Sequence, residues 1–249
     1  MNTDLMLLVA AEWIGAVALG MLVSLSPAVQ KIRPLQFLFP RREASITFAL
    51  NAAIFIFSIL LYKSFFTLPA EFTVIDLEAG WQRIILDFTI LLVMATALVT
   101  RRQPVRSALW SKEGLRSGFQ FGLLMAVMTI FIRAKISTII NGIEPTEGMA
   151  LLQSFLIAFC EVTVFFGFSQ PRLSARFGSR TGWLMSATLY ALWQIIPLAL
   201  HGASGSTALF QVILAVGQGL ILGWITPRSR HVLGLVIYLT LSQWLFLIK

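Results

Sequence analysis

The sequence predicts an all-α membrane protein with about eight transmembrane helices, and three observations support this fold class. Hydrophobic residues occupy 57% of the 249 positions and charged residues only 12%, about half the charged share of an ordinary soluble protein. The apolar residues form runs long enough to cross a hydrocarbon core of ~30 Å. Most of the basic residues lie in clusters between these runs. A soluble domain is therefore excluded, and the lipid bilayer is the expected surrounding of the chain.

Eight apolar runs are expected to form the helices. They cover residues 5–25, 44–62, 81–100, 118–140, 147–168, 181–200, 207–225 and 231–248. Arg133 and Lys135 interrupt the end of the fourth run, and their long side chains are expected to snorkel to the interface. No linker, low-complexity tract or repeat divides the sequence, so residues 1–249 are predicted to form a single membrane domain.

The basic residues alternate along the connections between the runs. Every second connection is basic, and these four together hold fourteen of the nineteen Lys and Arg residues: Lys31, Arg33, Arg41, Arg42, Arg101, Arg102, Arg106, Lys112, Arg116, Arg172, Arg176, Arg180, Arg228 and Arg230. The other connections hold Lys63, Arg133 and Lys135 with Glu71, Asp76, Glu78, Glu144 and Glu147.

This alternation predicts an orientation, because cytoplasmic loops of membrane proteins are enriched in Lys and Arg. The basic connections are expected in the cytoplasm and both termini on the opposite side, in a bacterial cytoplasmic membrane. The net charge of +8 is interpreted as a topology signal, so no nucleic-acid partner is predicted.

Three acidic residues stand out inside the apolar runs, where a charge is costly enough to make each one a candidate for function. Glu12 lies near the start of the first run and is expected to reach the outer interface. Asp87 follows Arg83 by four residues, a spacing that permits an ion pair on one helix face. Glu161 has no basic residue near it in its own run, and it is the principal candidate.

Several short motifs follow Glu161. Residues 161–173 read Glu-Val-Thr-Val-Phe-Phe-Gly-Phe-Ser-Gln-Pro-Arg-Leu, residues 176–178 read Arg-Phe-Gly, and residues 219–224 read Gly-Leu-Ile-Leu-Gly-Trp before a basic turn. In combination these segments resemble the core of the CPBP family. That family comprises the CAAX prenyl endopeptidases and the bacteriocin-processing or immunity (Abi) proteins. The resemblance covers residues 147–248 and implies a CPBP-like core there.

The resemblance implies an intramembrane glutamate protease, but most of the catalytic motif positions carry other residues. The family has a Glu pair and an Arg in its first motif, a His four residues after an aromatic in its second, and a His with an Asn four residues later in its third. Glu161 alone is kept. The motif-equivalent positions that carry other residues are Val162, Phe166, Gln194, Leu239 and Gln243. Gln194 follows the aromatic Tyr190, and a weaker match to the third motif is Tyr238 with Ser242.

These replacements have a chemical consequence. A glutamate-dependent peptidase needs a carboxylate to deprotonate water and an imidazole, amide or metal to stabilise the oxyanion. Glu161 cannot supply both. The two histidines, His201 and His231, lie near helix ends and away from the expected depth of Glu161, and Cys160 is the single cysteine. No metal site and no cofactor are therefore predicted.

The leading prediction is a pseudoenzyme, a non-catalytic CPBP-like protein that acts by binding. Its partners would be other membrane protein subunits, with the chain as an accessory or scaffold subunit of a larger complex or as an immunity-type partner. Glu161, Gln194 and Gln243 would then form a buried polar cluster across three helices. Two alternatives remain: a divergent intramembrane CAAX-type endopeptidase, and a protein that binds lipids or small molecules in a cavity around Glu161.

Two Gly-x-x-x-Gly spacings, Gly118 with Gly122 and Gly219 with Gly223, allow helices to approach closely. Packing within the chain is their expected use.

Overall fold

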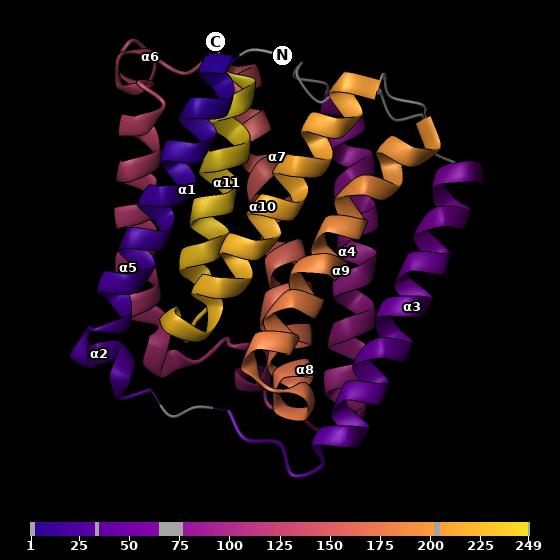
Figure 1. The fold of residues 1–249 in the computed structure, drawn as a ribbon. Helices are drawn as coiled ribbons and strands as arrows, with labels where there is room; N and C mark the ends of the chain where they lie inside the picture. Colours follow the sequence, from indigo (N-terminus) through magenta and orange to yellow (C-terminus); the bar gives the residue numbers. More distant parts are fainter. Residues whose placement is uncertain (1–2, 33–34, 65–76, 202–204, 249) are drawn as a thin grey trace.

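The computed structural model describes residues 3–32, 35–64, 77–201 and 205–248, and all regular structure in this part of the chain is helical (Figure 1). The elements are α1 (Thr3–Ser24), α2 (Pro27–Gln30), α3 (Pro40–Ser64), α4 (Leu77–Thr100), η1 (Val105–Ala108), α5 (Lys112–Ile132), α6 (Ile136–Ile140), α7 (Pro145–Glu161), η2 (Val162–Ser169), α8 (Gln170–Phe177), α9 (Ser179–His201), α10 (Gly205–Ser229) and α11 (Leu233–Leu247). The predicted all-α fold class is confirmed.

Six segments of the described chain are long and apolar enough to cross a membrane. They are Leu5–Ser24, Pro40–Leu61, Gly80–Thr100, Val105–Ile132, Pro145–Phe177 and Ala208–Ser229. The other two predicted runs correspond to α9 and to α11, which is apolar but only 15 residues long. The chain is therefore an integral membrane protein.

Large apolar side chains cover the outside of the helices. Examples are Leu7, Ile14, Leu22, Ile85 and Val99, each between 60% and 76% exposed. Such a surface requires a hydrocarbon environment, since a soluble monomer rarely exposes extended apolar patches.

The helices pack into one bundle in which α11 lies against α5 and α7, and α9 lies against α8 and α10. Helix α1 packs on α5 and α10, α4 packs on α7, and α3 covers α8 and α9 at one edge (Figure 1). Trp193, Phe165 and Phe166 are among the largest fully buried side chains. The segment that begins at Glu161 therefore lies in the interior.

Both glycine pairs lie at helix contacts within the chain, as predicted. A Cβ atom on Gly122 of α5 would lie 3.2 Å from the Cα atom of Gly234 in α11. A Cβ atom on Gly219 of α10 would lie 2.8 Å from the carbonyl oxygen of Ala187 in α9. In both places the missing side chain allows the backbones to approach closely.

The four basic connections lie together at one end of the bundle, which we call the basic end. Figure 1 shows the connections that follow α1, α4, α8 and α10 at this end, whereas α1 begins and α11 finishes at the other. The side of the membrane that each end faces remains a prediction. Arg33, Glu71 and Asp76 lie outside the described residues.

The predictions for Glu12 and Arg133 were wrong. Glu12 is 1% exposed and Arg133 7% exposed, and Arg133 donates to Oε2 of Glu12 from Nε at 2.8 Å and from Nη2 at 2.6 Å. Helix α5 ends at Ile132, so the run 118–140 is not one helix. The sequence alone favours the nearest interface for each charge, whereas the packing of α1 on α5 provides a partner of opposite charge inside the protein.

Candidate functional site

Glu161 lies in the middle of one long helical run and not near its end. It is the last residue of α7, which continues through the π-helical segment η2 into α8 and ends at Phe177. Every residue of η2 is buried. Wider π-helical turns inside α-helices are frequent at functional sites. The predicted boundary at residue 168 had placed Glu161 too close to the end of its helix.

Both carboxylate oxygens of Glu161 have partners from other helices. Arg83 of α4 donates from Nη2 to Oε1 at 2.7 Å. Gln194 of α9 donates from Nε2 to Oε2 at 2.7 Å. Arg83 Nη2 also contacts Oε1 of Gln194 at 3.2 Å, which closes the contact between the three side chains.

Asp87 extends this arrangement. Arg83 donates from Nε to Oδ2 of Asp87 at 3.0 Å, so the predicted pair within α4 is confirmed. Trp193 donates from Nε1 to Oδ1 of Asp87 at 2.9 Å, and its ring lies 5.2 Å from Cζ of Arg83. We call Arg83, Asp87, Glu161, Trp193 and Gln194 the mid-bundle network.

The mid-bundle network is almost completely removed from solvent. Glu161 and Asp87 are fully buried and Arg83 is 6% exposed. Buried charges persist in proteins only when they are paired and hydrogen-bonded. Here one guanidinium lies between two carboxyls, so Arg83 is the centre of the network.

The other predicted site residues lie outside this network. Val162, Phe166 and Leu239 are fully buried in the apolar core. Gln243 lies on α11 and makes no hydrogen bond with the described residues, whereas Glu161 and Gln194 do bond to each other. The third member of the predicted cluster is therefore Arg83 and not Gln243. The signal for Arg83 in the sequence is its spacing to Asp87, but a pair within one helix already accounts for that spacing.

His231 lies at the basic end, in the turn before α11. Its Nδ1 accepts a hydrogen bond from the backbone N–H of Leu233 at 3.0 Å, and its ring lies 5.4 Å from that of Trp110. Burial lowers the pKa of His231 below its ordinary value. His201 is the last residue of α9. Within the described residues no three His, Cys, Asp or Glu side chains are grouped as metal ligands.

A second buried network lies at the basic end around Glu43 of α3. Arg172 donates from Nε to Oε2 of Glu43 at 3.2 Å. Arg101 donates to both oxygens of Glu43, from Nη1 at 2.9 Å to Oε2 and from Nη2 to Oε1. Gln103 donates to Oε1 at 2.9 Å. We call Glu43, Arg101, Gln103, Arg172 and Ser107 the basic-end network.

Arg172 ties this network to the turn η1. Its Nη1 donates to the carbonyl of Ser107 at 3.0 Å, and its Nη2 donates to Oγ of Ser107 at 3.0 Å and to Oε1 of Gln103 at 2.6 Å. Arg172 belongs to the Gln-Pro-Arg-Leu segment and is fully buried in α8. Its assignment to a basic connection was therefore wrong, because α8 continues the previous helix.

Comparison with known families identifies the second half of the chain. Residues 145–245 match the family model described as Type II CAAX prenyl endopeptidase Rce1-like. This region is Rce1-like. The resemblance drawn from the motifs is thereby confirmed, and the Rce1-like region contains Glu161, Arg172 and Gln194. No curated protein and no solved structure matches the chain.

Six members of the two networks lie outside the Rce1-like region. Arg83 and Asp87 come from α4 and Glu43 comes from α3, whereas Arg101, Gln103 and Ser107 lie between α4 and α5. Both networks therefore join the Rce1-like region to the first helices of the chain. A search for motifs in the second half alone does not find these partners.

Proposed function

We propose that the chain is a non-catalytic Rce1-like membrane protein that acts by binding, as an accessory or scaffold subunit of a membrane complex. One observation carries the proposal: both oxygens of Glu161 are occupied, by Arg83 at 2.7 Å and by Gln194 at 2.7 Å.

A general base must present an oxygen to a water molecule within hydrogen-bond reach. Glu161 is fully buried, so water would have to enter the interior, and it would have to share the carboxylate with the hydrogen bonds from Arg83 and Gln194. Val162, Phe166 and Leu239 are apolar and supply no donor for an oxyanion. The network therefore favours a structural role for Glu161.

A binding role agrees with two features of the chain, the mid-bundle network and the exposed apolar side chains. The mid-bundle network holds α4, α7 and α9 together, which preserves the bundle without a reactive group. The exposed apolar side chains on α1 and α4 offer lipid-facing surface on which helices of another membrane protein can pack. A membrane protein is therefore the class of partner that we propose.

The test of catalysis uses a prenylated CAAX peptide and the full-length protein in liposomes. We expect equal product from the wild type, from Glu161→Gln and from protein-free liposomes. The substitution keeps the shape of the side chain and removes its function as a base. Cleavage by the wild type that falls by about 10²-fold or more in a normally folded Glu161→Gln variant would show a peptidase instead.

The test of binding uses the same two proteins, purified in mild detergent after gentle crosslinking in native membranes. Mass spectrometry should identify at least one other membrane protein in near-stoichiometric amount with both. A clean monomer in both preparations would contradict the accessory role.

A further inference from the structure

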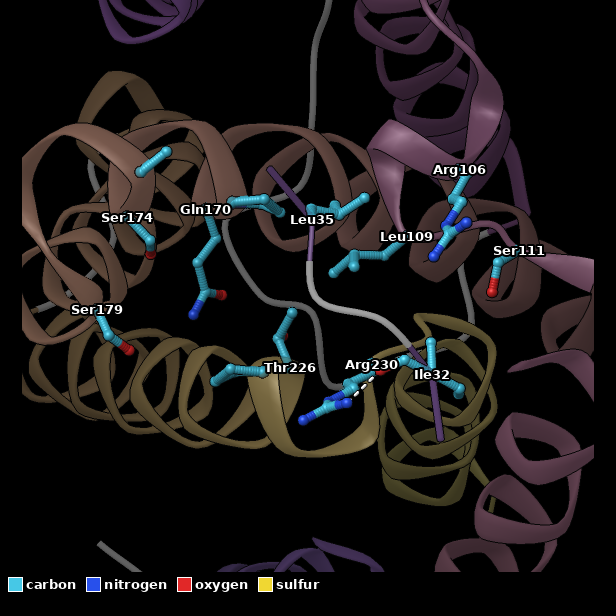
Figure 2. A pocket seen from close by; sticks show the side chains of 13 residues that line it. Ile32, Leu35, Arg106, Leu109, Ser111, Gln170, Ser174, Ser179, Thr226 and Arg230 are labelled. Carbon is cyan, nitrogen blue, oxygen red and sulfur yellow. Dashed lines mark hydrogen bonds between the residues drawn. The ribbon is translucent and has the colours of Figure 1, made fainter. Parts of the chain in front are cut away.

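A cavity of about 340 Å³ opens at the basic end, between η1, α8 and the last turn of α10 (Figure 2). Gln170, which lines it, follows Glu161 by nine positions in the chain, and no member of either network is among the lining residues. Its volume is at the lower end of the range for small-molecule sites, so it fits a headgroup and not a whole lipid.

Two arginines face the cavity from different elements. Arg106 comes from η1 and Arg230 from the turn after α10 (Figure 2). No Asp or Glu side chain is among the described residues that line it. The ion pair of Arg106 with Glu113 is 3.9 Å long, and the two side chains are 39% and 64% exposed, so solvent weakens it.

Arg230 uses only one of its three side-chain nitrogens in hydrogen bonds within the described part of the chain. Its Nη1 donates to the carbonyl of Gln30 at 3.1 Å and to the carbonyl of Ile32, which fixes the side chain. Its Nε and Nη2 have no hydrogen-bond partner within the described part of the chain. A guanidinium held in this way offers its remaining N–H groups to an anion, and phosphate oxygens match that geometry.

Gln170 adds an unpaired acceptor. The residue is 3% exposed, and its Nε2 donates to the carbonyl of Gly223 at 2.6 Å. Its Oε1 is buried without a partner among the described residues, and its amide points into the cavity (Figure 2). An unpaired buried acceptor is costly and calls for a donor. Lipid headgroups and sugar phosphates carry such donors as hydroxyl groups.

The backbone around the cavity is held in an unusual conformation. Leu109 has φ = 59° and Arg230 has φ = 52°, and both residues line the cavity. Left-handed backbone at non-glycine residues is concentrated at binding sites. The basic-end network supports this shape, because Arg172 holds Ser107 beside Arg106.

We infer that the cavity lies at the level of the lipid headgroups, from the ends of two crossing segments. The crossing segments Pro145–Phe177 and Ala208–Ser229 both end beside it. A group that enters there meets the phosphate layer of the adjacent leaflet.

We propose that this cavity binds a phosphate ester that carries hydroxyl donors, with Arg106 and Arg230 on the phosphate oxygens and Gln170 Oε1 on a hydroxyl. A phosphatidylglycerol headgroup has both features. Glycerol 3-phosphate offers the same chemistry from solution. The proposal does not depend on whether Glu161 is catalytic or on a protein partner.

The test is native mass spectrometry of the full-length protein in a neutral detergent, titrated with phosphatidylglycerol or phosphatidylcholine. We expect phosphatidylglycerol to bind more tightly, because phosphatidylcholine carries a compensating cation and no hydroxyl. Arg106→Gln should lower the affinity about tenfold, as expected for the loss of a charge-assisted hydrogen bond. The matched control is Arg116→Gln, an exposed arginine of α5 that does not line the cavity.

Two further arms complete the test. Gln170→Glu keeps the side-chain shape but places a negative charge beside the phosphate, so it should also weaken binding. Displacement of the lipid by glycerol 3-phosphate would indicate a soluble phosphate as the source, and no displacement a lipid. Arg230 is not the residue to replace, because it also donates to the carbonyls of Gln30 and Ile32 and its loss could disturb the fold. The decisive variant is therefore Arg106→Gln, provided that its melting temperature is unchanged. Equal binding of both lipids, or an equal loss in Arg116→Gln, would overturn the proposal.

Discussion

The mid-bundle network and the basic-end network differ in which charge is in excess. In the mid-bundle network the guanidinium of Arg83 lies between two carboxyls, Asp87 and Glu161. In the basic-end network the carboxylate of Glu43 lies between two guanidiniums, Arg101 and Arg172. The central group is therefore a cation in one network and an anion in the other.

The surroundings of the two networks also differ. Asp87 and Glu161 are fully buried, whereas the side chain of Arg101 is 19% exposed at the basic end. Arg172 has further acceptors in the carbonyls of Ser107 and Phe168. Removal of the central group should therefore be more damaging in the mid-bundle network, where the stranded carboxyls are shielded from solvent and Arg83 is the one cation that pairs with them among the described residues.

The largest effect is expected for Arg83→Met. The substitution keeps a long apolar stem but leaves Asp87 and Glu161 without their cation, so the free energy of unfolding should fall by about 3–5 kcal/mol. Denaturant unfolding in detergent measures it. As a control, Arg116→Met removes an exposed arginine and should change stability by no more than about 0.5 kcal/mol.

A rescue variant sharpens this prediction. The triple variant Arg83→Met, Asp87→Asn, Glu161→Gln removes the stranded charges and should recover much of the lost stability. A single Arg83→Met variant as stable as the wild type would mean that the network is not held by its charge.

A smaller loss is expected for Glu43→Gln. The amide keeps one acceptor for Arg172, and Arg101 can turn toward solvent, so the loss should be about 1–3 kcal/mol. The ratio of this loss in the free energy of unfolding to the loss in Arg83→Met tests whether the mid-bundle network is the more sensitive of the two. A larger loss for Glu43→Gln than for Arg83→Met would reverse our ranking.

Sequence reasoning predicted the helices well because hydrophobic runs report directly on the lipid environment. It also found Glu161 and Gln194, since both stand at positions of a known motif. It missed Arg83 as a partner of Glu161 because the two residues are 78 positions apart in the chain. The pairing of Glu12 with Arg133, across 121 positions, was missed for the same reason. A single sequence reports on the faces of each helix but not on which helices become neighbours.

The smallest effect concerns His231, which belongs to neither network. Burial lowers its pKa below the ordinary value of 6.5, so as the pH falls below about 6.5 the unfolded chain binds a proton that the folded chain does not. This contribution to stability is present above pH 6.5 and is lost as the pH falls toward the pKa of the folded state.

Unfolding measured between about pH 7.5 and about pH 5.5, one unit on either side of 6.5, tests this. His231→Asn keeps an acceptor for the N–H of Leu233 and should make the pH dependence shallower. An unchanged slope in that variant would assign the titration to other groups.

The position of Arg83 and Asp87 four residues apart has a consequence for the synthesis of the protein. Helix α4 is made before α7, and its two opposite charges lie where they can pair within the one helix before α7 is present. Helix α7 brings Glu161 with no cation of its own, and such a residue is costly in lipid. The helix made first therefore contains Arg83, the cation that pairs with Glu161 of the helix made later.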